Sequence, residues 1–343
     1  SLEPVQDWNP LMIAAAVNAP TCWVVVCTRN RPDALHGCLQ ALEQLAYPRF
    51  EVVVVDNAPS DRRACEVARK AGVRYVGEPI SGLSRARNTG ARACSSDVIA
   101  FIDDDAVPDP MWLAHLAAQF DDPDVAVATG RTLPLLEAAD ASGSDFTDLG
   151  PSVIRLDRCN PRWFEIASFG GIGNGNNMAF RRRVFKEWQG FDERLGRGAP
   201  LSSCEEHRAF AQLIDGGYAV VYTPKAIVRH PVPTTLEKHQ RQYIQSRAEL
   251  AAYAVFLFVV TRQRWRVARY VAEAVVGTRR NWRFHTERAP RAVSRWRLAR
   301  AYVAGACRGL WTTIEPTLPY PARPHAARLS RNAKRSPVGI AGE

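Results

Sequence analysis

Residues 98–108 read Val-Ile-Ala-Phe-Ile-Asp-Asp-Asp-Ala-Val-Pro, and the fold can be worked out from this stretch. Its five leading apolar residues predict a buried strand of a parallel sheet. Three carboxylates follow at once, and Pro108 prevents the hydrogen-bond ladder from continuing. Open α/β sheets bind ligands beyond the carboxyl ends of their strands, so the carboxylates fall where a ligand is expected.

The three aspartates at 103–105 predict a cation site. Negative charges this close repel one another unless a cation joins them. Oxygen ligands of this kind suit Mg²⁺ or Mn²⁺, which commonly binds one or two carboxylates together with a substrate's phosphates. The alternative is a solvated acidic turn before the helix expected near Met111.

Strands and helices alternate on the N-terminal side of this stretch. Apolar runs at 21–27 and 51–55 predict two more buried strands, and a short strand is expected at 73–76. Between the first two, leucines repeat at helical spacing over residues 35–45. Such alternation with short joins predicts a parallel sheet with right-handed crossovers.

Two common phosphate-binding patterns are missing from the sequence. The GxGxxG fingerprint would directly follow the first strand, but residues 28–32 contain no glycine, and the P-loop pattern is absent as well. Phosphate recognition is therefore expected from a metal ion and arginines.

Several short motifs follow one another along residues 21–231. They are Thr28-Arg29-Asn30-Arg31, Val55-Asp56-Asn57, Ala86-Arg87-Asn88-Thr89-Gly90, Asp103-Asp104-Asp105, Gly175-Asn176-Asn177, Gly190-Phe191-Asp192-Glu193, Glu205-Glu206 and Val228-Arg229-His230. The ordered set resembles a family 2 glycosyltransferase of the GT-A fold. The resemblance implies a Rossmann-like, mostly parallel sheet flanked by helices. It also implies an inverting enzyme that transfers a sugar from a nucleotide-diphosphate donor, with UDP- or dTDP-sugars favoured, in polysaccharide, glycolipid or cell-envelope glycan synthesis.

The same resemblance assigns roles to individual residues. Asp105, Asp103 and His230 would hold Mn²⁺ or Mg²⁺, and Asp56 would accept a hydrogen bond from the nucleobase. The expected nucleotide-sugar contacts are Thr28, Arg29, Asn30, Asp56, Arg85, Arg87, Asn88, Asp103 and Asp104. The expected lining of the donor sugar and the acceptor is Gly175, Asn176, Asn177 and Asp192.

The general base is expected at Glu206. The family usually has Glu-Asp opening a helix, whereas this chain has Glu205-Glu206. A base there would deprotonate the acceptor hydroxyl, but the extra methylene of glutamate shifts the carboxylate, so Glu205 stays an alternative. The structural interpretation is that both are first-turn acids that favour the helix dipole.

The chain divides into three predicted parts with different charge. An N-terminal arm (1–20) precedes a catalytic domain (21–235), whose nucleotide-sugar half (21–110) and acceptor half (111–235) differ in their motifs. A helical extension (236–343) holds 21 Lys+Arg against 6 Asp+Glu, a net charge of +15, while the rest holds 24 against 29. Eight cysteines without metal-ligand spacing predict reduced thiols in a cytoplasmic protein, and no signal peptide is expected.

The basic extension suggests an anionic partner. Its apolar run, Leu250 to Val260, has 11 residues, whereas a membrane span needs about 20. Tryptophans among arginines fit a peripheral anchor on the anionic inner face of the membrane, with a glycan or lipid-linked acceptor nearby, and they also fit helices packed on the body. The alternative hypothesis for the function is a nucleic-acid-binding protein that uses the basic extension, with the α/β body as scaffold. The sequence contains no recognised nucleic-acid module, so no nucleic-acid partner is expected.

Overall fold

A computed structural model describes residues 19–135, 147–232, 235–276 and 293–314. Residues 1–18 of the predicted arm, and residues 277–292 and 315–343 of the predicted helical extension, lie outside the described residues.

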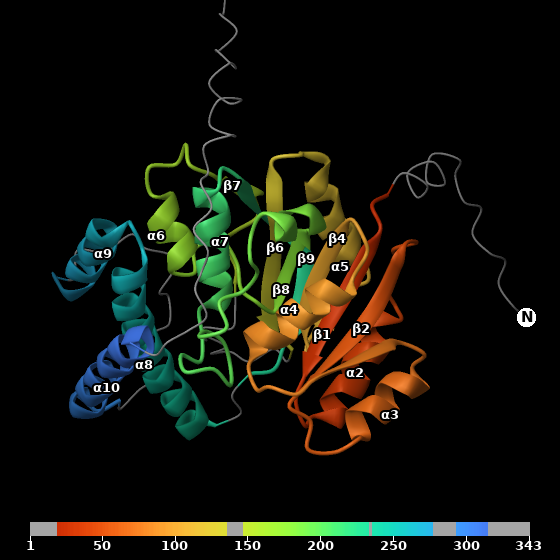
Figure 1. Cartoon of the computed structure of the whole chain (residues 1–343), viewed down its shortest axis with the longest axis horizontal. Coiled ribbons are helices and arrows are strands. Elements are labelled where there is room, and N and C mark those ends of the chain that lie inside the picture. Colours follow the sequence, from red (N-terminus) through yellow and green to blue (C-terminus); the bar gives the residue numbers. More distant parts are fainter. Residues whose placement is uncertain (1–18, 136–146, 233–234, 277–292, 315–343) are drawn as a thin grey trace, which may run out of the picture.

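One mixed sheet forms the centre of the described chain, with strand order β3-β2-β1-β4-β8-β6-β9-β5 and β7 paired to β9 (Figure 1). The strands are β1 (Cys22–Thr28), β2 (Phe50–Asn57), β3 (Arg74–Glu78), β4 (Val98–Asp103), β5 (Val107–Pro108), β6 (Val125–Pro134), β7 (Ile154–Leu156), β8 (Asn177–Arg181) and β9 (Ala219–His230).

The predicted α/β class is confirmed, and the parallel pairing is concentrated in the nucleotide half. Strands β3, β2, β1 and β4 are parallel neighbours, and β6 is parallel to β9. Strand β8 runs antiparallel to β4 and β6, and β5 and β7 run antiparallel to β9. The half that was expected to bind the acceptor is therefore the mixed part of the sheet.

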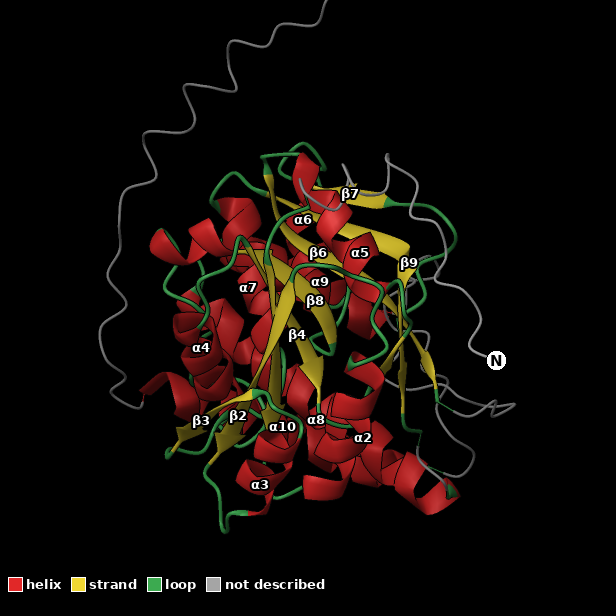
Figure 2. Ribbon diagram, turned by 90° about the vertical axis from the view of Figure 1, so that its right-hand side faces the viewer, coloured by secondary structure: helices red, strands yellow, loops and turns green. Residues whose placement is uncertain are grey.

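Helices cover both faces of the sheet, because alternate strand residues point to opposite faces. Val24 and Val26 pack with the helices of one face, and Trp23 and Val25 pack with those of the other. The first face carries α2 (Pro32–Leu42), α3 (Arg63–Lys70) and α5 (Trp112–Ala117) with η1 (Ala118–Asp121) after it. The second carries α4 (Leu83–Ala93), α6 (Trp163–Ser168) and α7 (Glu205–Asp215), and η2 (Arg182–Lys186) follows β8. Figure 2 shows the helices on either side of the strands.

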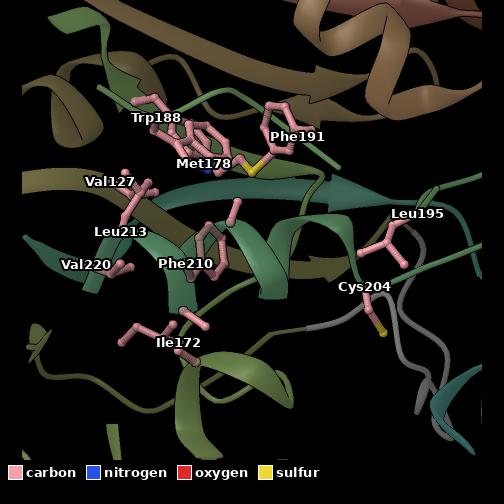
Figure 3. Close-up of a cluster of buried hydrophobic side chains, with 14 of the residues drawn as sticks. Val127, Ile172, Met178, Trp188, Phe191, Leu195, Cys204, Phe210, Leu213 and Val220 are labelled. Carbon is pink, nitrogen blue, oxygen red and sulfur yellow. The ribbon is translucent and has the colours of Figure 1, made fainter. Parts of the chain in front are cut away.

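Helix α7 is anchored in the second face by aromatic packing. Phe210 of α7 lies fully buried beside β8 and the Trp188–Phe191 turn (Figure 3). Phe180 contacts Phe191 edge-on, with ring centroids 5.4 Å apart, and stacks on Trp188 at 5.7 Å. This packing fixes the first turn of α7, which carries Glu205 and Glu206, relative to the sheet.

The C-terminal region folds into helices α8 (Leu236–Val260), α9 (Arg264–Val276) and α10 (Arg295–Ile314). Helix α8 packs on the catalytic body, with Tyr253 and Phe256 fully buried. It extends well beyond the 11-residue apolar run. By length and composition alone the helix could cross a membrane, and 39% of its most apolar window is buried inside the protein.

Candidate active site

Three potential metal ligands converge at one edge of the sheet. Asp103 ends β4, Asp105 follows it, and His230 ends β9, which pairs with β5 just beyond the aspartates. His230 Nε2 lies 3.2 Å from Asp105 Oδ1 and 3.8 Å from Asp103 Oδ2. One ligand atom from each residue lies within 4.8 Å of the other two. The topology thus brings together residues 125 positions apart in the sequence.

Arg31 and Thr28, in and after β1, hold the middle and last aspartates. Thr28 Oγ1 donates to Asp104 Oδ2 at 2.7 Å, and Arg31 contacts Asp104 at 2.9 Å and also Asp105. Burial raises the pKa of Asp104 to about 6. Burial alone would raise the pKa of Asp105, but the neighbouring His230 and Arg31 lower it, and the net result is a pKa below the ordinary value.

Arg87 connects the metal-type cluster to the expected base. This fully buried guanidinium lies 2.5 Å from Glu205 Oε1 and 3.7 Å from Asp103 Oδ1, and it donates to the carbonyl of Gly175 at 2.9 Å. A Cβ on residue 175 would lie 2.9 Å from Nη2 of Arg87, so the glycine lets the loop approach this closely. Glu205 is therefore committed to an ion pair inside the protein.

Glu206 is arranged differently from Glu205. Its Oε1 accepts from the Gly175 backbone N–H at 3.3 Å and lies 3.7 Å from His207 Nε2, whereas its Oε2 is buried without a hydrogen-bond partner in the described residues. Burial and the Glu206 carboxylate raise the pKa of Glu205 to about 7. Burial alone would raise the pKa of Glu206, but the charges of His207 and Arg87 hold this pKa below its ordinary value.

A cavity of about 820 Å³ joins these groups. Eight of the residues expected at the site line it: Arg87, Asp103, Asp105, Gly175, Asn176, Glu205, Glu206 and His230. Its other walls come from the loop at 147–149, the glycine-rich loop after α6, and the first half of α8.

Three expected contact residues are engaged inside the protein and lie outside the cavity lining. Asn177 is fully buried: its side-chain amide donates to the carbonyls of Ala226 and Arg131, and its side-chain oxygen accepts from Trp112 Nε1. Asn88 exchanges hydrogen bonds with the Phe191 backbone. Asp192 pairs with Arg194 and Arg208, each at 2.8 Å.

The remaining expected nucleotide contacts lie around the ends of β1 and β2. Asp56 Oδ2 accepts from Tyr75 at 3.0 Å, while its Oδ1 is buried without a partner in the described chain. Arg29 donates to Ser81, Asn30 accepts from Ser60, and Arg85 pairs with Glu193 at 2.7 Å.

Sequence reasoning missed two parts of the cavity wall. His207 was not singled out, although it directly follows the Glu205-Glu206 pair. Residues 238–250 of α8 were assigned to an extension outside the catalytic domain, but they line the cavity. The available signal was the spacing of Lys238, Arg241, Gln242, Gln245 and Glu249, which places polar groups on one helix face.

Residues 23–188 match the family described as Glycosyl transferase family 2. A pre-mycofactocin glycosyltransferase of Mycobacterium tuberculosis is 29% identical over 222 residues, which cover 62% of this chain and 43% of that protein. The chain thus spans under half the length of that relative. The succinoglycan biosynthesis protein ExoM of Rhizobium meliloti is 29% identical over 267 residues, 71% of this chain and 78% of that protein.

Two solved structures share the fold at low sequence identity. The mannosyltransferase PcManGT of Pyrobaculum calidifontis, in complex with GDP-Man and Mn²⁺, has a TM-score of 0.53 at 19% identity and covers 93% of this chain and 81% of that one. Residues 1–349 of S. aureus TarS give 0.51 at 16% identity and cover 86% and 81%. Residues 23–188, just under half of the chain, thus carry a match to glycosyl transferase family 2, and the α/β body has the GT-A fold.

Proposed function

We propose that this protein transfers a sugar, with inversion, from a nucleoside-diphosphate donor to the hydroxyl of a glycan or lipid-linked acceptor. UDP- and dTDP-sugars are the favoured donors, and polysaccharide, glycolipid or cell-envelope glycan synthesis is the favoured setting. The observation that carries the proposal is that the Asp103–Asp105–His230 cluster and Glu206 line the same cavity. The family match over residues 23–188 favours this function over the nucleic-acid-binding alternative.

The cluster fits a divalent cation by its chemistry. Two carboxylates and an imidazole offer oxygen and nitrogen ligands that suit Mn²⁺, and Mg²⁺ through the carboxylates. Asp105 Oδ1 is buried without a hydrogen bond, although it lies 3.2 Å from a ring nitrogen of His230, as expected for lone pairs that share a cation. Asp103, Asp105 and His230 would hold the ion. When bound, it would neutralise the charge that develops on the leaving diphosphate.

Glu206 is the proposed general base. Its Oε2 is buried and unpaired among the described residues, whereas Glu205 is held by Arg87. Glu206 would take the proton of the acceptor hydroxyl as that oxygen attacks the anomeric carbon opposite the leaving group. A single displacement of this kind inverts the configuration at that carbon. Arg87 would act as a positioning residue, because it contacts both Glu205 and Asp103.

The nucleotide is proposed to lie at the ends of β1 and β2. Asp56 Oδ1 has no hydrogen-bond partner in the described chain and would accept from a nucleobase N–H. Arg29, Asn30 and Arg85 lie around these strand ends and supply polar contacts. We also propose a cytoplasmic location with peripheral attachment to an anionic membrane, supported by tryptophans and arginines of α10.

The test is nucleoside-diphosphate binding and nucleotide-sugar hydrolysis, each measured in Mn²⁺ and in EDTA. UDP, dTDP and GDP with their sugars form the panel. We expect binding that depends on the metal, and loss of both the metal effect and hydrolysis in Asp105→Asn. Asp148→Asn is the matched control, since Asp148 also lines the cavity but pairs with Arg131 outside the cluster. Equal affinity with and without metal would rule out the metal-dependent mechanism.

A further inference from the structure

The first half of α8 forms one wall of the cavity. Eight of its residues between Lys238 and Leu250 line the cavity, and five polar ones lie three or four positions apart, so they form a polar stripe about three turns long. The stripe consists of Lys238, Arg241, Gln242, Gln245 and Glu249. Although the motif pattern of the family ends before this helix, α8 contributes more side chains to the cavity than any strand does.

The wall is held firmly against the catalytic body. Ser202 donates to Glu249 at 2.8 Å, and the guanidinium of Arg208 from α7 lies 5.4 Å from the centre of the Phe256 ring. Tyr253 contacts Phe169 edge-on at 6.1 Å between ring centroids. The stripe therefore has a fixed position relative to Glu206, which lies in the first turn of α7.

The position of the wall assigns it to the acceptor. The metal-type cluster lies at the edge of the sheet, and α7 lies between the sheet and α8 (Figure 1). In a single displacement the diphosphate leaves on one side of the anomeric carbon and the acceptor attacks from the other. With the diphosphate at the cluster and Glu206 beside the attacking hydroxyl, the rest of the acceptor extends toward α8.

The outer part of the cavity is positively charged. Lys238 and Arg241 lie at its α8 end, Arg247 of α8 lines it while packing over the Tyr243 ring at 4.8 Å, and Arg197 lines it as well. Of the lining carboxylates outside the cluster, Glu205 pairs with Arg87 and Asp148 with Arg131, whereas Glu249 accepts hydrogen bonds from Ser202 and Gln245, and Glu206 accepts from the Gly175 backbone. Arg241 pairs with Glu237 at 2.8 Å on the exposed helix surface, a contact that stabilises little.

We propose that the acceptor is a saccharide that carries a phosphate or a carboxylate, bound by Lys238 and Arg241. The side-chain amides of Gln242 and Gln245, on the same stripe, offer donors and acceptors for the sugar hydroxyls next to that anion. This inference rests on the proposed function, because it takes the cavity as the place where donor and acceptor meet.

The experiment measures acceptor binding without turnover. Full-length protein is saturated with Mn²⁺ and the nucleoside diphosphate that binds best, so that the metal-type cluster is occupied. Calorimetry then gives the affinity for methyl β-glucoside, its 6-phosphate and methyl β-glucuronide. We expect at least one charged sugar to bind about tenfold more tightly than the neutral one, with the difference shrinking as salt rises. The two charged sugars distinguish a phosphate from a carboxylate.

Two double variants decide the location. Lys238→Gln/Arg241→Gln should abolish the preference for the charged sugar and leave nucleoside-diphosphate binding unchanged. Arg69→Gln/Lys70→Gln removes the same two residue types from the exposed end of α3 and should keep the preference. The inference is overturned if neutral and charged sugars bind alike, if none binds, or if the preference survives in Lys238→Gln/Arg241→Gln. Failure of every nucleoside diphosphate to bind would instead contradict the proposed function.

Discussion

At the scale of single residues, the site depends on one buried cation. Arg87 is 3% exposed and contacts Glu205, Asp103 and the carbonyl of Gly175. A buried arginine keeps its charge and needs compensation, which the two carboxylates supply. The arrangement uses one of two neighbouring glutamates as a counterion and leaves the other available to a substrate.

The first prediction concerns that division of roles. Glu206→Gln should lower kcat by about 10² or more, because base catalysis contributes roughly 10²–10⁴. Nucleoside-diphosphate affinity should change little, since Glu206 lies outside the cluster. Glu206→Asp restores the residue usual in the family and should retain more activity than Glu206→Gln. A Glu206→Gln enzyme with wild-type kcat would remove Glu206 from the mechanism.

A second residue-scale prediction uses the titration of Glu205. Burial and Glu206 raise its pKa from the ordinary 4.5 to about 7. Between these values the folded chain holds a proton that the unfolded chain has released. The contribution of Glu205 to the free energy of unfolding is therefore greatest below pH 4.5 and is lost as the pH rises to about 7.

Urea unfolding at pH 5 and pH 7.5 tests the direction in which the free energy of unfolding changes with pH. Glu205→Gln should show a smaller fall in the free energy of unfolding between the two pH values than the wild type. The exposed Glu43→Gln in the C-cap of α2 is the control and should keep the wild-type fall. An unchanged fall in Glu205→Gln would mean that another group carries the pH dependence.

Much of the site was predictable from the sequence because each strand ends in its own polar motif. Asp103, Asp105 and His230 were assigned to one metal site, and the structure brings them together. Asn88 and Asn177 look the same in the sequence as ligand-binding amides. Their use within the protein depends on which backbone groups the fold leaves unpaired, such as the Ala226 carbonyl, and sequence spacing does not contain that information.

At the scale of elements, α8 and α10 approach unusually closely. A Cβ on Gly305 would lie 2.1 Å from the Ala248 carbonyl oxygen, and one on Gly309 would lie 2.1 Å from that of Ala252. The two glycines are four positions apart and share one helix face. Small residues at such spacing let two helix backbones touch. Sequence patterns alone left open whether these helices pack on the body or remain free for a membrane, and this contact joins α10 to a helix of the body.

Two glycine-to-alanine variants, one in α10 and one in α2, test this packing. Gly309→Ala should destabilise the protein by about 1–3 kcal/mol, because the added methyl overpacks the contact. Gly37→Ala in α2 should instead stabilise it by up to about 1 kcal/mol, since alanine favours helix and nothing lies within 4 Å of the new Cβ. Thermal unfolding of both variants gives the comparison. Stabilisation by Gly309→Ala would show that the helices separate readily.

Sequence patterns predicted the parallel strands best, and they predicted least well the segments that follow later in the sequence and pair antiparallel. Apolar runs such as 23–26 and 53–55 are buried on both faces, so their pattern identifies them directly. Strand β8 follows a glycine-rich loop and runs antiparallel between β4 and β6, a pairing fixed by long-range contacts. The polar stripe of α8 was hidden for a related reason: its function depends on the cavity it faces.

At the scale of the whole molecule, α10 has two different faces. Gly305, Gly309 and Thr312 are buried, whereas Trp296, Val303, Leu310, Trp311 and Ile314 are exposed. Trp296, Val303, Leu310 and Ile314 recur at intervals of seven and four residues, and Trp311 lies next to Leu310, so the exposed set forms one apolar stripe. Arg295, Arg297, Arg300 and Arg308 are interspersed along the same helix. An apolar stripe with tryptophan and arginine is typical of a helix that lies in a membrane interface.

The last prediction follows from this surface. The protein should bind vesicles that contain phosphatidylglycerol and should bind neutral phosphatidylcholine vesicles weakly, because each basic residue near an anionic surface contributes about 1 kcal/mol. Binding should weaken as salt rises, since the charges are screened.

Trp296→Ala/Trp311→Ala should release the protein from the vesicles without unfolding it, as both side chains are more than 60% exposed. Ile80→Ala/Met111→Ala removes two exposed apolar side chains from the catalytic body and should leave binding intact. Sedimentation with the vesicles measures all three proteins. Equal loss of binding in both double variants would show that exposed apolar area in general, not the α10 stripe, causes the attachment, and absence of wild-type binding at low salt would exclude the membrane interface altogether.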